Sequence, residues 1–143
     1  MGQRTRGRKF LLQCRYAAEA NGQSLDQNLE SMSVSTRVTD PETRIWLRDL
    51  GFLALKHKED IDRKIESALE NWSMDRLTPV TRLILQQAVC ENLYMDIPAP
   101  VAVKEAVKLA IEFEGPKTGS FVNGVLDRLL FRTERQPGSL TKE

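Results

Sequence analysis

The sequence is poor in the residues that most enzymes and metal sites need. Its 143 residues include two cysteines, Cys14 and Cys90, and a single histidine, His57. Two thiols so far apart in the sequence make neither a disulfide framework nor a zinc site, and we predict that both are small buried hydrophobic residues. A lone histidine between two lysines fits a solvated or helix-capping role better than catalysis. We therefore expect no metal site.

Sequence motifs of catalysis are also missing. The segment "GPKT" (115–118) is similar to the end of a phosphate-binding loop, but Pro116 separates the glycine from the lysine, and a helix rather than a strand is predicted before it. The chain contains no nucleophile elbow and no dinucleotide-binding fingerprint. Its paired acids, such as Asp60 and Asp62, fall on a charged helical surface. We predict that the protein is not an enzyme.

Long hydrophobic runs are absent too. No stretch approaches the roughly 20 apolar residues that span a bilayer, and no signal-peptide pattern follows the basic N-terminus. Cytoplasmic residence is therefore the expectation. The apolar content of 41% and the charged content of 29% are typical of a soluble globular protein. We expect one domain at residues 1–135 and a disordered tail at residues 136–143.

Helical periodicity runs along nearly the whole chain. Apolar residues recur every three or four positions, Gly and Pro cluster at the joints, and no stretch alternates with period two. Asp40-Pro41 and Thr78-Pro79 indicate helix starts, because the polar residue can cap the first turn and proline is tolerated in it. We predict an all-α fold with seven helices, at about 4–20, 25–33, 41–57, 59–71, 79–95, 100–113 and 119–132, with a loop at 114–120.

Two of these helices carry further information. The helix at about 79–95 is apolar around most of its circumference, which is typical of a central helix. Gly124 lies inside the last helix, where glycine costs about 1 kcal/mol relative to alanine. We expect the close approach of another helix to compensate for that cost.

Positive charge is concentrated at the N-terminus. The chain holds 21 Lys and Arg against 20 Asp and Glu, but no acid precedes Glu19. Five cations lie before it: Arg4, Arg6, Arg8, Lys9 and Arg15. The remainder of the chain therefore has 16 cations against 20 acids. At about 100° per residue, Arg4, Arg8 and Arg15 align on the side of the first helix that faces away from its apolar arc.

This basic face has two interpretations. A charge run at a terminus is usually solvated. Arginine, however, forks onto phosphate oxygens, so a row of arginines also suits a nucleic acid backbone. Leu12 and Tyr16 form a second apolar strip outside the core arc, and apolar residues on a polar face can mark a binding surface. The residues alone leave both interpretations open.

Four segments make the second interpretation more specific. They are "RTRGRKFLLQCRY" (4–16), "NWSMDRLTPVTRLIL" (71–85), "DIPAPVAVKEAVKLA" (96–110) and "FVNGVLDRLL" (121–130). Together they resemble the NusB family of bacterial transcription antitermination factors. The resemblance covers nearly the whole chain in the family's order, and its most specific part is "FVNGVLD" after "VAVKEAVKLA".

The resemblance implies both a fold and a function. NusB-like proteins are all-helical, with two small packed helical subdomains. They pair with a small-subunit ribosomal protein, called NusE in this role, and the pair binds a short single-stranded RNA element called boxA. Loaded onto RNA polymerase, the assembly suppresses premature termination, chiefly in ribosomal RNA operons. Neither catalysis nor a cofactor is implied.

The family motifs assign roles to particular positions. Those expected to contact RNA are Arg4, Arg6, Arg8, Lys9, Arg15, Phe113, Lys117, Ser120 and Phe121. Those expected at the interface with the ribosomal protein are Leu12, Tyr16 and Thr81. For Phe113 and Phe121, packing in the core is an equal alternative. The chain departs from the family pattern at Gly7, Arg15, Lys104 and Ser120, where Ala, an apolar residue, Asn and Lys are common.

Two other functions stay open on the sequence. NusB-like domains also form the RNA-binding part of an rRNA cytosine methyltransferase, and this chain could be a detached relative of that domain. A self-associating helical module, such as a homodimer with a solvated basic end, is the other. Weak RNA binding alone, with tighter binding beside the ribosomal partner, would favour the antitermination role.

Overall fold

The computed structural model of the protein describes residues 2–33, 38–70 and 73–131. Within these ranges it contains seven α-helices, two short helices of other types and no strand. The α-helices are α1 (Gln3–Asn21), α2 (Leu25–Ser31), α3 (Pro41–Lys56), α4 (Lys58–Ala68), α5 (Pro79–Tyr94), α6 (Ala99–Glu114) and α7 (Pro116–Leu126). The short helices are the 3₁₀ turn η2 (Met74–Arg76) and the π-helical turn η3 (Asp127–Phe131). The predicted all-α class with seven helices is confirmed.

Capping residues fix where several helices begin. The carboxylate of Asp40 and the hydroxyl of Thr78 each accept a hydrogen bond of 3.1 Å from the backbone N–H three residues later. A proline occupies the first turn after each cap. Helix α2 begins with a reciprocal capping box between Ser24 and Gln27. The two helix starts predicted from the Asp-Pro and Thr-Pro pairs are confirmed.

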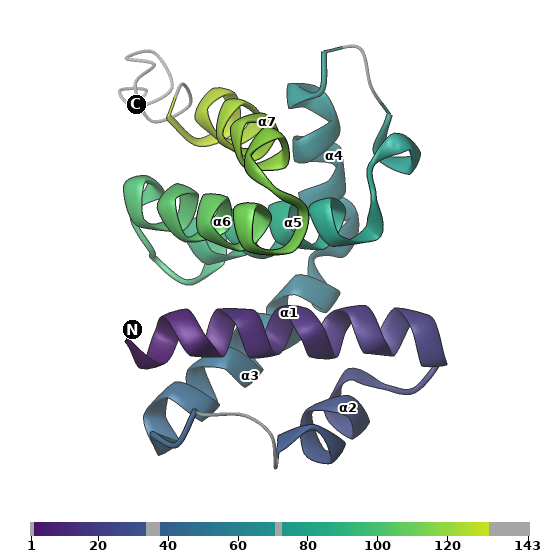
Figure 1. The fold of residues 1–143 in the computed structure, drawn as a ribbon, viewed down its shortest axis with the longest axis vertical. Coiled ribbons are helices and arrows are strands. Elements are labelled where there is room, and N and C mark those ends of the chain that lie inside the picture. Colours follow the sequence, from purple (N-terminus) through teal and green to yellow (C-terminus); the bar gives the residue numbers. More distant parts are fainter. Residues whose placement is uncertain (1, 34–37, 71–72, 132–143) are drawn as a thin grey trace.

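The helices form two groups around a shared hydrophobic core (Figure 1). Helices α1, α2 and α3 make the lower group in this view, and α4 to α7 make the upper one. Helix α1 packs on α2 and α3 and also contacts α5 of the other group. Helix α5 is buried from Leu83 to Glu91 without interruption, so the prediction that it is central is confirmed.

The turn between α6 and α7 is shorter than predicted. Gly115 adopts a positive φ of 96°, a conformation that favours glycine, and Pro116 starts α7 immediately after it. Most of the predicted loop at 114–120 is therefore helical, and that prediction was wrong. The clustered Gly, Pro and Ser residues had indicated a long loop, but a single glycine is enough to reverse the chain direction.

Close helix packing occurs at a different glycine from the one expected. A Cβ atom added at Gly119 would lie 2.6 Å from Cγ1 of Ile111, because α7 packs tightly on α6. At Gly124 a Cβ would meet only the end of an arginine side chain, at 3.8 Å. The expectation of a close helix contact at Gly124 was therefore wrong.

The predicted burial of the two cysteines is confirmed. Cys14 and Cys90 are free and buried, and burial raises the pKa of the first to about 11 and of the second to about 12. Among the described residues, no cluster of His, Cys, Asp and Glu could hold a metal ion. No helix in the described ranges is long and apolar enough to cross a membrane. The predicted tail at 136–143 lies outside those ranges.

Candidate nucleic-acid interface

The cations of α1 do not all lie where a helical wheel places them. Helix α1 packs against α3 on one side and against α5 on another, so two of its faces are buried. The side opposite the apolar arc meets α5, and Arg8 and Arg15 are only 4% and 7% exposed. The prediction that these two arginines present free charge to RNA was wrong.

Arg8 forms a buried ion pair between the two helix groups. Its guanidinium donates to both carboxylate oxygens of Glu91 on α5, at 2.7 to 3.0 Å, and lies 3.7 Å from Glu105 on α6. Burial raises the pKa of Glu91, and the hydrogen bonds from Arg8 lower it. The short two-pronged contact is that of a carboxylate with an arginine, so we take Glu91 as ionised at neutral pH.

Arg15 links α1 to α5 through uncharged partners. It donates to the backbone carbonyl of Leu83 at 3.0 Å and to the side-chain oxygens of Gln87 and Gln86 at 3.2 and 2.7 Å. Burial lowers the pKa of Arg15 to about 10, which still leaves it charged at neutral pH. Arg15 is thus a structural link between α1 and α5.

Two residues expected at a protein partner are also inside the molecule. Leu12 is 2% exposed and belongs to the core, and Thr81 is 5% exposed. The Thr81 hydroxyl donates to Glu114 of α6 at 2.8 Å. The prediction of direct partner contacts for Leu12 and Thr81 was wrong, because both side chains are buried within the folded chain.

The surface that α1 does expose is a narrow stripe. It contains Arg6, Lys9, Gln13 and Tyr16, and we call these four residues the α1 stripe. Their spacing of three, four and three residues places them on one face of the helix. Tyr16 is 47% exposed, Gln13 is exposed, and the two cations are half-buried.

The two cations of the α1 stripe differ in their surroundings. Arg6 has no ion-pair partner within the described residues, whereas Lys9 pairs with Glu112 of α6. Gln13 was missed by the sequence interpretation because it is uncharged. Its register with Arg6 and Tyr16 was the signal that could have identified it.

Arg4 is exposed at the start of the same helix. Its guanidinium lies 4.5 Å from the ring centroid of Trp46 on α3, and that of Arg8 lies 5.0 Å from the same ring. A cation over an aromatic face is oriented without being withdrawn from solvent. Arg4 therefore adds an oriented, accessible positive charge near the α1 stripe.

The remaining predicted residues lie at the corner between α6 and α7. Phe113, Lys117 and Ser120 are exposed there, while Phe121 is half-buried and packs against the core. The ammonium of Lys9 lies 6.0 Å from the ring of Phe113. This contact brings the corner next to the α1 stripe. Phe113 is a surface residue, and Phe121 mainly supports the corner from within.

A fixed charged pair lies one turn beyond Tyr16. Glu19 accepts two hydrogen bonds from Arg82 of α5, at 2.6 and 2.9 Å. These bonds lower the pKa of Glu19 and raise that of Arg82. The carboxylate of Glu19, next to the exposed Tyr16, is thus held in place by Arg82 of α5.

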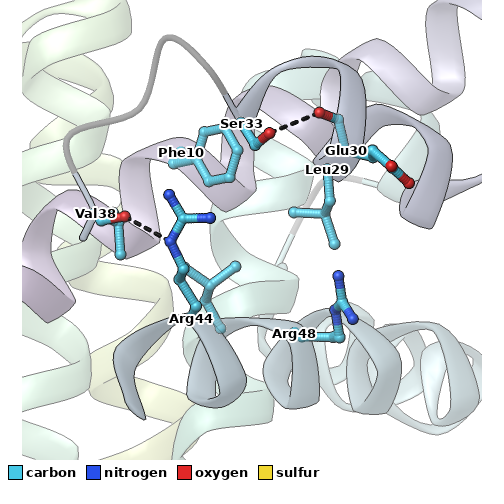
Figure 2. A pocket seen from close by; sticks show the side chains of 8 residues that line it. Phe10, Leu29, Glu30, Ser33, Val38, Arg44 and Arg48 are labelled. Atoms are coloured by element: carbon cyan, nitrogen blue, oxygen red, sulfur yellow. Dashed lines mark hydrogen bonds between the residues drawn. The ribbon is translucent and has the colours of Figure 1, made fainter. Parts of the chain in front are cut away.

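A cavity of about 280 Å³ lies between α1, α2 and α3 (Figure 2). It is lined by Phe10, Leu29, Glu30, Ser33, Val38, Arg44, Leu47 and Arg48. Figure 2 shows Arg44 donating to the Val38 carbonyl, at 2.8 Å, and Ser33 donating to the Glu30 carbonyl, at 2.7 Å. The lining includes none of the residues predicted to contact RNA or a partner, so it is not part of the candidate interface.

Comparison with known proteins connects this surface to a family. The model of the NusB family matches residues 5–131. The transcription antitermination protein NusB of Oceanobacillus iheyensis is 34% identical over 128 residues, which cover 89% of this chain and 98% of that protein. The NusB of Methylacidiphilum infernorum is 43% identical over 86 residues, which cover 59% of this chain and 57% of that protein.

Solved structures give the same result at the level of the fold. A complex of the antitermination factors NusB and NusE with double-stranded RNA contains a chain that superimposes with a TM-score of 0.82 at 26% identity, covering 92% of this chain and 98% of that one. NusB of T. maritima superimposes with a TM-score of 0.78 at 28% identity, covering 90% of each chain. The fold matches that of the solved NusB structures, and the family model matches residues 5–131. The chain therefore belongs to the NusB family.

Proposed function

We propose that the protein is an RNA-binding transcription antitermination factor that acts with a NusE-type small-subunit ribosomal protein. In this proposal the pair binds boxA-type single-stranded RNA and joins an RNA polymerase antitermination complex that promotes transcription of ribosomal RNA operons. The observation that carries the proposal is the exposed α1 stripe, in which cations and a tyrosine share one helix face. The related chain in a NusB–NusE–RNA complex supports the choice of partners.

The accessible cations would hold the RNA by its phosphates. These are Arg4, Arg6, Lys9 and Lys117. Lys9 would exchange Glu112 for a phosphate, at little cost because both side chains are about half exposed and surface ion pairs are weak. Phe113 offers a ring on which a base can stack, and Ser120 borders the same corner. Phosphate contacts set affinity and register, whereas stacking and base edges set preference.

Titration of a labelled boxA-like RNA tests the proposal directly. We expect weak binding by the protein alone and tighter binding when the NusE-type partner is present. The logarithm of the affinity should fall linearly with the logarithm of the salt concentration, because bound phosphates release counterions. A double-stranded RNA of the same sequence serves as the comparison. Absence of binding to either RNA, with and without the partner, would refute the proposed function.

Replacing Arg4 and Arg6 together by Gln should weaken RNA binding without unfolding the protein. If each arginine neutralises one phosphate, the slope of log affinity against log salt should decrease in magnitude by about 1.4 for single-stranded RNA. The matched control replaces Arg48 and Arg63, which are exposed on α3 and α4, by Gln. An equal effect of both double variants would show that only overall charge matters.

Tyr16→Ala should weaken the complex with the ribosomal partner while leaving the fold intact. An exposed tyrosine at an interface often contributes much of the binding energy, so we expect a loss of affinity of roughly tenfold or more. The measurement is isothermal titration calorimetry with the partner. Phe52→Ala on α3 is the control, since Phe52 is 61% exposed and lies outside the candidate interface. An unchanged affinity of the Tyr16 variant for the partner would show that Tyr16 is not part of the interface.

A further inference from the structure

The outer face of α6 carries a second row of exposed residues that no predicted role uses. Val101, Lys104, Lys108 and Ile111 are all exposed, and their spacing of three, four and three residues places them on one side of the helix. The two lysines are four residues apart, about 6 Å along the helix axis. We call these four residues the α6 row.

Two acids near the α6 row contact cations of α1. Glu105 lies 3.7 Å from the guanidinium of Arg8, and Glu112 forms an ion pair with Lys9. Lys108 forms an ion pair of 3.5 Å with Glu105, an acid that also lies near Arg8. Lys104 has no ion-pair partner in the part of the chain that the structure describes. Within the described residues, the charge of Lys104 is therefore uncompensated, and Lys108 shares its one acid with Arg8.

The α6 row lies between the two parts of the proposed RNA surface. On one flank, Glu105 and Glu112 face the cations of α1. On the other flank, Ile111 contacts Gly119, so α7 and its exposed residues adjoin the row. Figure 1 shows α1, α6 and α7 one above another. The α6 row is thus flanked by α1 on one side and by α7 on the other.

We propose that Lys104 and Lys108 bind the phosphate backbone of the same RNA strand that the α1 stripe holds. The strand would cross the outer face of α6 on its way from α1 toward α7. Val101 and Ile111 would lie against the apolar faces of riboses or bases. This inference rests on the proposed function and extends it, since it assigns to α6 an RNA contact that lengthens the bound segment. The ligand class is a single-stranded polynucleotide rather than a free phosphate, because the cations are spread along a helix and not gathered in a pocket.

A double substitution tests this inference. In Lys104→Gln/Lys108→Gln, we expect RNA affinity to fall roughly tenfold at low salt and the magnitude of the salt slope to fall by about 1.4. The control is Lys56→Gln/Lys64→Gln, which removes two exposed lysines from α3 and α4. Both variants should keep the wild-type melting temperature, because all four side chains are exposed. The wild-type protein and both variants are titrated with a long and a shortened boxA-like RNA.

The outcomes separate the two hypotheses. If Lys104→Gln/Lys108→Gln loses more affinity for the long RNA than for the shortened one, this result supports a contact between α6 and an outer part of the RNA strand. A wild-type protein that binds RNA normally, with an α6 variant indistinguishable from the control, overturns only the role of Lys104 and Lys108. A wild-type protein that binds neither RNA overturns the proposed function as well.

Discussion

Arg8→Met is expected to lower the free energy of unfolding by about 3–5 kcal/mol, the usual cost of removing one partner from a buried ion pair. Methionine retains most of the volume of the arginine stem but leaves Glu91 buried without its hydrogen-bond donors. Glu105 loses the same cation and keeps its contact of 3.5 Å with Lys108, so Glu91 is the carboxylate left without a cation. Urea denaturation followed by circular dichroism would measure the change.

The penalty should depend on pH in a definite direction. Burial raises the pKa of Glu91 in the folded protein, and removing Arg8 takes away the groups that lower it. In the variant the folded carboxyl therefore binds a proton more readily than the unfolded one. Destabilisation should shrink as the pH falls through that raised pKa, so it should be smaller at about pH 5 than at about pH 8.

A second variant keeps this prediction falsifiable. Arg8→Met/Glu91→Met removes both charges and should recover most of the lost stability, since paired apolar replacements of buried ion pairs are often neutral. A double variant as unstable as the single one would show that the loss comes from packing. An Arg8→Met protein as stable as the wild type would contradict the buried pair itself.

This pair also explains why the basic residues gather at one end of the chain. The α1 cations meet acids supplied by the later helices, as in the pairs of Arg8 with Glu91 and of Lys9 with Glu112. A basic first segment and an acidic remainder are thus complementary halves of one fold. The uneven charge distribution serves the joint between the two helix groups as well as any external ligand.

Local sequence signals predicted the helices well. Asp40 and Thr78 cap the helices they were expected to cap, because a cap depends only on the first turn. The position of α7 was harder to predict, since a single glycine with positive φ can replace a loop. The residues of the site depended instead on tertiary packing.

The exposed face of α1 could not be read from its own sequence. A helical wheel assumes one buried side, but α1 is covered by α3 and by α5. Leu12 and Arg15 therefore became interior residues although they lie outside the apolar arc. Tyr16 and Arg6 stayed accessible because they occupy the gap between the two contacts. The packing of α3 and α5 decides which polar side chains of α1 reach solvent.

Arg15→Met is expected to lower the free energy of unfolding by about 2–3 kcal/mol, because it leaves the side-chain oxygens of Gln86 and Gln87 buried without a donor. Loss of the buried charge offsets part of this cost. The matched control is Arg82→Met, which breaks the two hydrogen bonds to Glu19 at the same joint. That pair is partly exposed, so its loss should cost less than about 1 kcal/mol.

The pH dependence and the RNA affinity of the Arg15 variant distinguish its role from that of Arg8. The folded pKa of Arg15, about 10, lies below its ordinary value, so its proton is lost first in the folded state and only at high pH. The penalty of Arg15→Met should therefore be flat from about pH 6 to about pH 8, unlike that of Arg8→Met. RNA affinity, measured where the variant is fully folded, should stay within about twofold of wild type, since a buried guanidinium reaches no phosphate. A stable Arg15→Met protein with weakened RNA binding would instead indicate that Arg15 contacts RNA.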